Sequence, residues 1–69
     1  MTRRKIIQIL NRAKSNPGEQ TGIINTMKEH VRGKFRQGDI EMAIINHSKG
    51  NYPTGSAADK IQEAINSQG

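Results

Sequence analysis

Residues 3–14 read RRKIIQILNRAK and carry the clearest periodic pattern in the chain. Four apolar residues recur with the i, i+3, i+4, i+7 spacing of one helical face: Ile6, Ile9, Leu10 and Ala13. Thr2 stands where a side-chain oxygen can cap the first turn. The turn residues Asn16, Pro17 and Gly18 follow and favour a helix end. We therefore expect a first helix at about residues 3–14.

Three further segments favour helices. A second helix is predicted at about residues 19–36, because four apolar residues would share one face there: Ile24, Met27, Val31 and Phe35. Asp39 can serve as the N-cap of a short third helix at about residues 40–47. A last helix is expected from Ser56, where Ser-Ala-Ala-Asp resembles a capping box. The sequence thus predicts a small all-α domain of three or four short helices.

The middle of the chain also permits strands. Val31, Gly33 and Phe35 alternate with three cations, and the spacing of Ile40, Met42 and Ile44 is that of a strand face as well. These two runs could pair as a hairpin. The alternative fold is therefore an α+β domain with a hairpin at about residues 30–46.

The length and composition indicate a single small basic domain spanning residues 1–69, with residues 67–69 expected to fray. Only 32 % of the 69 residues are hydrophobic, and ten of them are Ile against one Leu. A core built from so few large side chains is thin. We therefore expect either a marginally stable monomer or a homodimer that shares its core.

The sequence offers little for catalysis or metal binding. It has no Cys, which excludes disulfides, thiolate metal sites and Cys nucleophiles, and which favours an intracellular, cytoplasmic location. Its longest apolar run is four residues, Met42 to Ile45, so no membrane span is expected. The two imidazoles, His30 and His47, stand 17 positions apart and match no metal motif. We expect His47 to be half-buried near a helix end, where its charged form would interact favourably with the helix dipole. We predict no catalytic residue, no metal, no cofactor and no enzyme activity.

The charge distribution is the strongest functional signal. Residues 1–36 contain nine Lys and Arg against two acids, which gives that half a formal charge of +7. Residues 37–69 contain two Lys and four acids, a charge of −2. A basic half of this kind favours a polyanion-binding surface over general solubility.

Two basic faces are predicted within residues 3–36. On the first helix Arg4, Gln8, Asn11 and Arg12 would share a side that can contact bases and phosphates. On the second helix Lys28, Arg32 and Arg36 would form a row for phosphates. The full set of candidate nucleic-acid-binding residues is Arg3, Arg4, Lys5, Gln8, Arg12, Lys28, Arg32, Lys34 and Arg36.

These residues predict a non-catalytic nucleic-acid-binding accessory or regulatory protein, with DNA slightly favoured over RNA. The alternative is an inhibitor or assembly factor that binds an acidic surface of a protein partner, since the same cations would serve it. A single Tyr and a single Phe are too few for a base-stacking platform.

Overall fold

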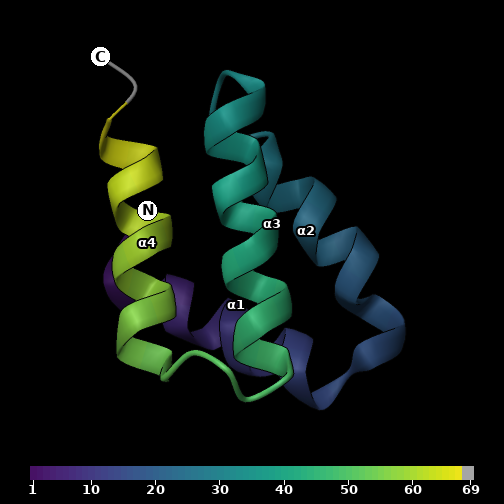
Figure 1. Cartoon of the computed structure of the whole chain (residues 1–69). Helices are drawn as coiled ribbons and strands as arrows, with labels where there is room; N and C mark the ends of the chain where they lie inside the picture. Colours follow the sequence, from purple (N-terminus) through teal and green to yellow (C-terminus); the bar gives the residue numbers. More distant parts are fainter. Residues whose placement is uncertain (68–69) are drawn as a thin grey trace.

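The computed structural model describes residues 1–67 of the chain. Their helical elements are α1 (Arg3–Ser15), the 3₁₀ turn η1 (Pro17–Glu19), α2 (Gln20–Lys28), α3 (Lys34–Ser48) and α4 (Thr54–Asn66), as Figure 1 shows. Residues 1–67 contain no strand. The all-α prediction is therefore confirmed, and the alternative hairpin at about residues 30–46 is wrong.

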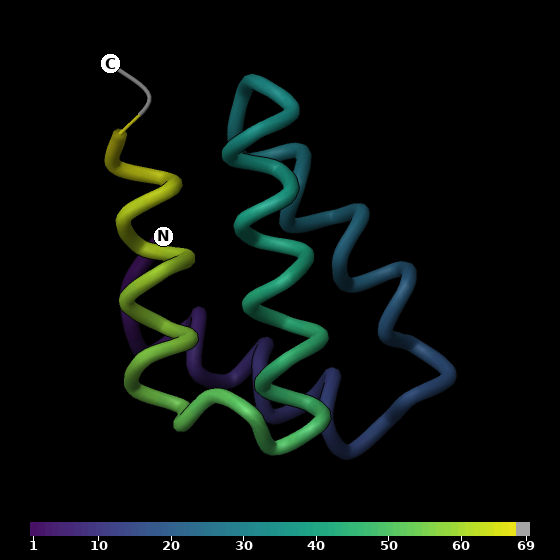
Figure 2. Tube along the Cα trace, in the orientation of Figure 1, coloured from purple at the N-terminus to yellow at the C-terminus, as the bar shows by residue number. Residues whose placement is uncertain are grey.

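The helices pack around α3. Helix α4 lies antiparallel to α3 on one side, and α2 lies along its other side (Figures 1 and 2). Helix α1 crosses behind α3 and α4, near the end of α3 and the start of α4. One face of α1 is therefore covered by the bundle, and its opposite face is turned to solvent.

The core is built from aliphatic side chains of all four helices. Its buried members are Ile6, Leu10, Ala13, Ile24, Met27, Val31, Ile40, Ala43, Ile44, Ala57, Ala58, Ile61 and Ala64. Five of the thirteen are Ala, and four of these come from α3 and α4. Alanine adds little volume, so the backbones of these two helices can approach closely while the Ile side chains fill the centre.

The first helix forms as the sequence predicts. It begins at Arg3, and Oγ1 of Thr2 accepts a hydrogen bond from the backbone N–H of Lys5 at 3.3 Å. It ends at Ser15, and the backbone N–H of Asn16 donates to the carbonyl of Arg12 at 2.9 Å. The predicted cap and the predicted stop therefore lie within one residue of the observed ends.

The predicted single helix over residues 19–36 is wrong. Helix α2 ends at Lys28, and residues 29–33 form a turn before α3. Gly33, the residue directly before α3, has a φ of +90°, which is incompatible with a continuous right-handed helix through this segment. The side-chain amide of Gln37 donates to the carbonyls of Lys28 and Val31, both at 3.2 Å, and satisfies backbone groups that the helix end exposes. Phe35 consequently lies in α3 and is 86 % exposed, not on an apolar face of α2.

Helix α3 is longer than the predicted helix at residues 40–47, and Asp39 is not its N-cap. Gly38 and Asp39 lie inside it. A glycine inside a helix costs roughly 1 kcal/mol relative to alanine. Burial of Ile40 and Ile44 on the inner face, each with no exposed surface, outweighs that cost.

The last helix also begins earlier than predicted. It starts at Thr54 after Pro53, and the carbonyl of Pro53 accepts a hydrogen bond from the backbone N–H of Ala57 at 3.0 Å. Ser56 is therefore inside the first turn, not at its cap. At the other end Oγ of Ser67 donates to the carbonyl of Glu63 at 2.6 Å. Residues 68–69, which belong to the segment expected to fray, lie outside the described residues.

Replacement of Gly33 tests the origin of the break between α2 and α3. Gly33→Ala should lower the free energy of unfolding by about 1–3 kcal/mol, because a side chain at this positive φ is strained. Gly22→Ala is the matched control, since Gly22 lies in α2 and an added Cβ there would meet no atom within 4 Å. The control should gain up to about 1 kcal/mol in urea unfolding. Equal effects of the two substitutions would contradict this explanation.

Candidate nucleic-acid interface

One side of α1 carries cations and amides with no acidic residue in the helix. Ile6, Leu10 and Ala13 point into the core and have no exposed surface. We define the α1 outer face as the exposed residues Arg4, Lys5, Gln8, Asn11 and Arg12. With a rise of about 1.5 Å per residue, the 13 residues of α1 give this face a length of roughly 20 Å.

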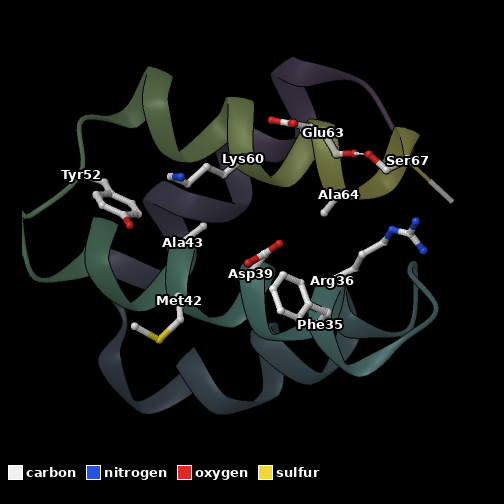
Figure 3. Close-up of a pocket in the computed structure, with 10 residues that line it drawn as sticks. All are labelled: Phe35, Arg36, Asp39, Met42, Ala43, Tyr52, Lys60, Glu63, Ala64 and Ser67. Carbon is white, nitrogen blue, oxygen red and sulfur yellow. Dashed lines mark hydrogen bonds between the residues drawn. The ribbon is translucent and has the colours of Figure 1, made fainter.

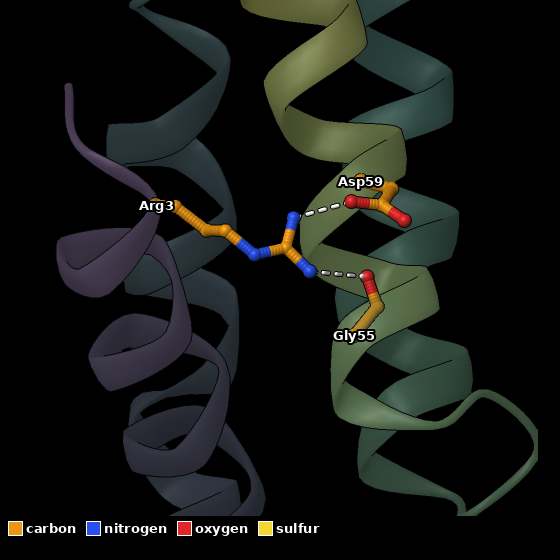
Figure 4. A network of polar contacts seen from close by, with 3 residues as sticks. All are labelled: Arg3, Gly55 and Asp59. Atoms are coloured by element: carbon orange, nitrogen blue, oxygen red, sulfur yellow. Dashed lines mark hydrogen bonds and ion pairs between the residues drawn. The ribbon is translucent and has the colours of Figure 1, made fainter.

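Arg3 is not available on the α1 outer face. Its guanidinium forms an ion pair with the carboxylate of Asp59 and donates to the carbonyl of Gly55 at 3.3 Å (Figure 4). Both partners belong to α4. Arg3 therefore links the start of α1 to α4, a contact worth about 0–1 kcal/mol because both side chains are substantially exposed.

Arg12 is paired but remains accessible. Its Nη2 lies 3.0 Å from Oε1 of Glu19, and its side chain is 65 % exposed. A guanidinium has five N–H donors, so this contact leaves others for a ligand. No ion pair joins Arg4 or Lys5 to any carboxylate in residues 1–67. These two cations are the freest in the α1 outer face.

The predicted row of Lys28, Arg32 and Arg36 on one helix is wrong. Lys28 ends α2, Arg32 lies in the turn, and Arg36 belongs to the first turn of α3. Lys28 is also paired, with its Nζ 3.4 Å from Oε1 of Glu41 on α3. The early end of α2 at Lys28 and the turn at residues 29–33 thus split the row among three elements.

The structure does not bring the two predicted basic faces together. Arg32, Lys34 and Arg36 lie in or next to the first turn of α3, at the top of Figure 1. Helix α1 crosses near the other end of α3, where the charge of Lys14 and the backbone of Leu10 affect the pKa of His47. The 15 residues of α3 span roughly 22 Å. Of the nine candidates, the structure groups Arg4, Lys5, Gln8 and Arg12.

His47 is more buried than predicted. Its side chain is 2 % exposed, and its Nε2 lies 2.9 Å from Oγ1 of Thr54. Burial lowers the pKa of His47 below its ordinary value of 6.5, and the charge of Lys14 lowers it further, while the backbone carbonyl of Leu10 acts in the opposite direction. The neutral form is therefore favoured, and the expectation of a half-buried imidazole is wrong.

The sequence reasoning missed a groove between α3 and α4. The groove has a volume of about 450 Å³, and the exposed Phe35 and Met42 lie along it (Figure 3). The available signal was the i, i+7 spacing of these two residues, which places them on one face of a helix. The sequence pattern places Phe35 in the helix at residues 19–36 and Met42 in the helix at residues 40–47, so the spacing of the two residues predicted no shared face.

Residues 1–67 contain neither a cluster of metal-binding side chains nor a membrane-spanning helix. No three His, Cys, Asp or Glu side chains lie close enough together to hold a metal ion. No helix in the same residues is long and apolar enough to cross a bilayer.

Comparisons with protein-family models, curated proteins and solved structures found no match to this chain.

The burial of His47 predicts a pH-dependent stability. Because its pKa is lower in the folded protein, the unfolded chain binds more protons once the pH falls to about 6.5. Stability should therefore be full above the unfolded pKa and should decline as the pH falls from about 7.5 to about 5.5, which urea unfolding can measure.

The matched variants are His47→Gln and His30→Gln. The first should flatten the decline in this pH range, and the second should keep it, because His30 is exposed. A wild-type slope in His47→Gln would show that another group controls the pH dependence.

Proposed function

We propose that this protein is a non-catalytic nucleic-acid-binding accessory or regulatory factor that docks through the α1 outer face. The observation that carries the proposal is the uncovered side of α1, which presents Arg4, Lys5 and Arg12 with no acidic residue in the same helix. A chain with a formal charge of +5 adds a general attraction for polyanions.

The dimensions of α1 support duplex DNA as the ligand. A helix with its side chains is about 10–12 Å wide, and the major groove of B-DNA is about 12 Å wide. The corresponding groove of an RNA duplex is deep and narrow and excludes a helix. DNA is therefore favoured over RNA for this face.

The α1 outer face also has the side chains that read bases. Arg4 can pair with the guanine edge, and Gln8 and Asn11 can pair with the adenine edge. On α1, Lys5 directly follows Arg4, and Arg12 stands four positions after Gln8. Both cations can therefore contact phosphates beside these bases. We propose that the protein has no catalytic activity, metal or cofactor, and that it is cytoplasmic.

The same cations fit an acidic protein surface, which remains the competing partner. The two ligands differ in shape, because duplex DNA offers a groove that fits α1 and poly-glutamate does not, so DNA docking should give the tighter binding at both salt concentrations. Duplex DNA and poly-glutamate, each titrated at two salt concentrations, therefore separate the two proposals. Equal binding of both ligands, or binding of poly-glutamate alone, would favour the acidic protein partner.

Removal of two cations tests the proposed face. If Lys5 and Arg12 each neutralise one phosphate while Arg4 contacts a base, the logarithm of the DNA affinity should fall with the logarithm of salt concentration with a slope of roughly −1.8. Arg4→Ala/Lys5→Ala should weaken DNA binding and reduce the slope to roughly −0.9. Fluorescence anisotropy with a labelled duplex measures both quantities.

The control variant is Asn25→Asp/Asn66→Asp. It lowers the net charge by the same two units at exposed positions of α2 and α4, outside the α1 outer face. It should keep most of the affinity and the original slope. Equal losses in both variants would contradict docking through α1, as would wild-type binding by Arg4→Ala/Lys5→Ala.

A further inference from the structure

Helix α3 carries apolar side chains on its outer side as well as in the core. Ile40 and Ile44 are fully buried on its inner side. Phe35 and Met42, two turns apart on the outer side, are 86 % and 52 % exposed. Large apolar side chains that are this exposed to solvent on one face indicate a surface that a partner covers.

A hollow lies beside these two side chains. The buried Ala43 of α3 and Ala64 of α4 both line the groove, and Phe35, Met42 and Tyr52 stand around it (Figure 3). The volume of about 450 Å³ accommodates apolar side chains from a partner. Projecting apolar groups and a receiving groove therefore share one face, as an interface between identical chains requires.

The charges along the groove are balanced. Arg36 and Lys60 line it together with Asp39 and Glu63. None of these four forms an ion pair within residues 1–67, although Lys60 lies 5.5 Å from the centre of the Tyr52 ring. A face with two positive and two negative groups has no preference for a polyanion, but a second copy of the same face can pair every charge.

We propose that the α3–α4 groove is the interface of a homodimer, with the α3 helices of two copies crossing antiparallel about a twofold axis near Gly38. In this arrangement Phe35 of one copy meets Met42 of the second copy, and the converse contact follows from symmetry. Arg36 of each copy comes within reach of Asp39 of the other.

Gly38 supports this crossing point. An added Cβ at Gly38 would meet no atom within 4 Å, so packing within the chain does not require glycine there. Gly38 also lies between Phe35 and Met42 on α3. A residue without a side chain at this point lets two helix backbones approach closely.

Sedimentation equilibrium on nuclease-treated protein tests the proposal. The wild-type chain should show a concentration-dependent shift from monomer to dimer mass. Phe35→Asp should raise the dimer dissociation constant by about tenfold or more, since it removes the most exposed apolar group of the interface. Asn25→Asp adds the same charge at an exposed site of α2 and should leave the dissociation constant unchanged.

A charge exchange identifies the partner as a second copy. Arg36→Asp and Asp39→Arg should each weaken the dimer, because like charges then face each other across the axis. The double variant Arg36→Asp/Asp39→Arg restores opposite charges between copies and should recover affinity to within about threefold of the wild type. Circular dichroism confirms that each variant is folded.

Three results would overturn the proposal. The first is a wild-type chain that stays monomeric up to about millimolar concentration, which spans the weakest specific associations. The second is a dimer that Phe35→Asp leaves intact. The third is a double charge exchange that binds no better than either single variant.

Discussion

Burial of one side of α1 against α3 and α4 is the constraint on which the position of the α1 outer face depends. Ile6, Leu10 and Ala13 have no exposed surface, so α1 cannot rotate about its axis without moving aliphatic groups into water. The orientation of the α1 outer face is thus set by the core, not by the charges. The ion pair of Arg3 with Asp59 adds little energy, but it joins α1 to α4 at the same edge.

The sequence predicts local structure well where periodicity and capping agree. In α1, Thr2 and Pro17 bracket a regular apolar pattern, and both ends lie within one residue of the prediction. In residues 19–36 the apolar spacing alone predicts a continuous helix, which the structure does not contain. In the structure Gly33 has a positive φ, and the side chain of Gln37 in the next helix donates hydrogen bonds to the carbonyls of Lys28 and Val31, contacts that no local pattern reveals.

The same break explains which part of the candidate site the sequence could predict. Arg4, Lys5, Gln8 and Arg12 lie within one helix, so their shared side follows from helical geometry. Lys28, Arg32 and Arg36 were grouped only because a continuous helix was assumed. Ion pairs with distant residues, such as Lys28 with Glu41, arise from tertiary packing and have no signal in the sequence. The exposed position of Phe35 was missed for the same reason.

The position of α1 behind the α3–α4 groove has a consequence for assembly. In Figure 3 the ribbon of α1 lies on the far side of the helices that form the groove. Because Ile6, Leu10 and Ala13 face the core, the α1 outer face is turned away from these helices. Two copies joined through their grooves would hold their α1 outer faces back to back, facing outward in opposite directions. Such a particle could not lay both helices along neighbouring half-sites of one duplex. Taken together, the two proposals imply that such a dimer would instead join two separate duplexes.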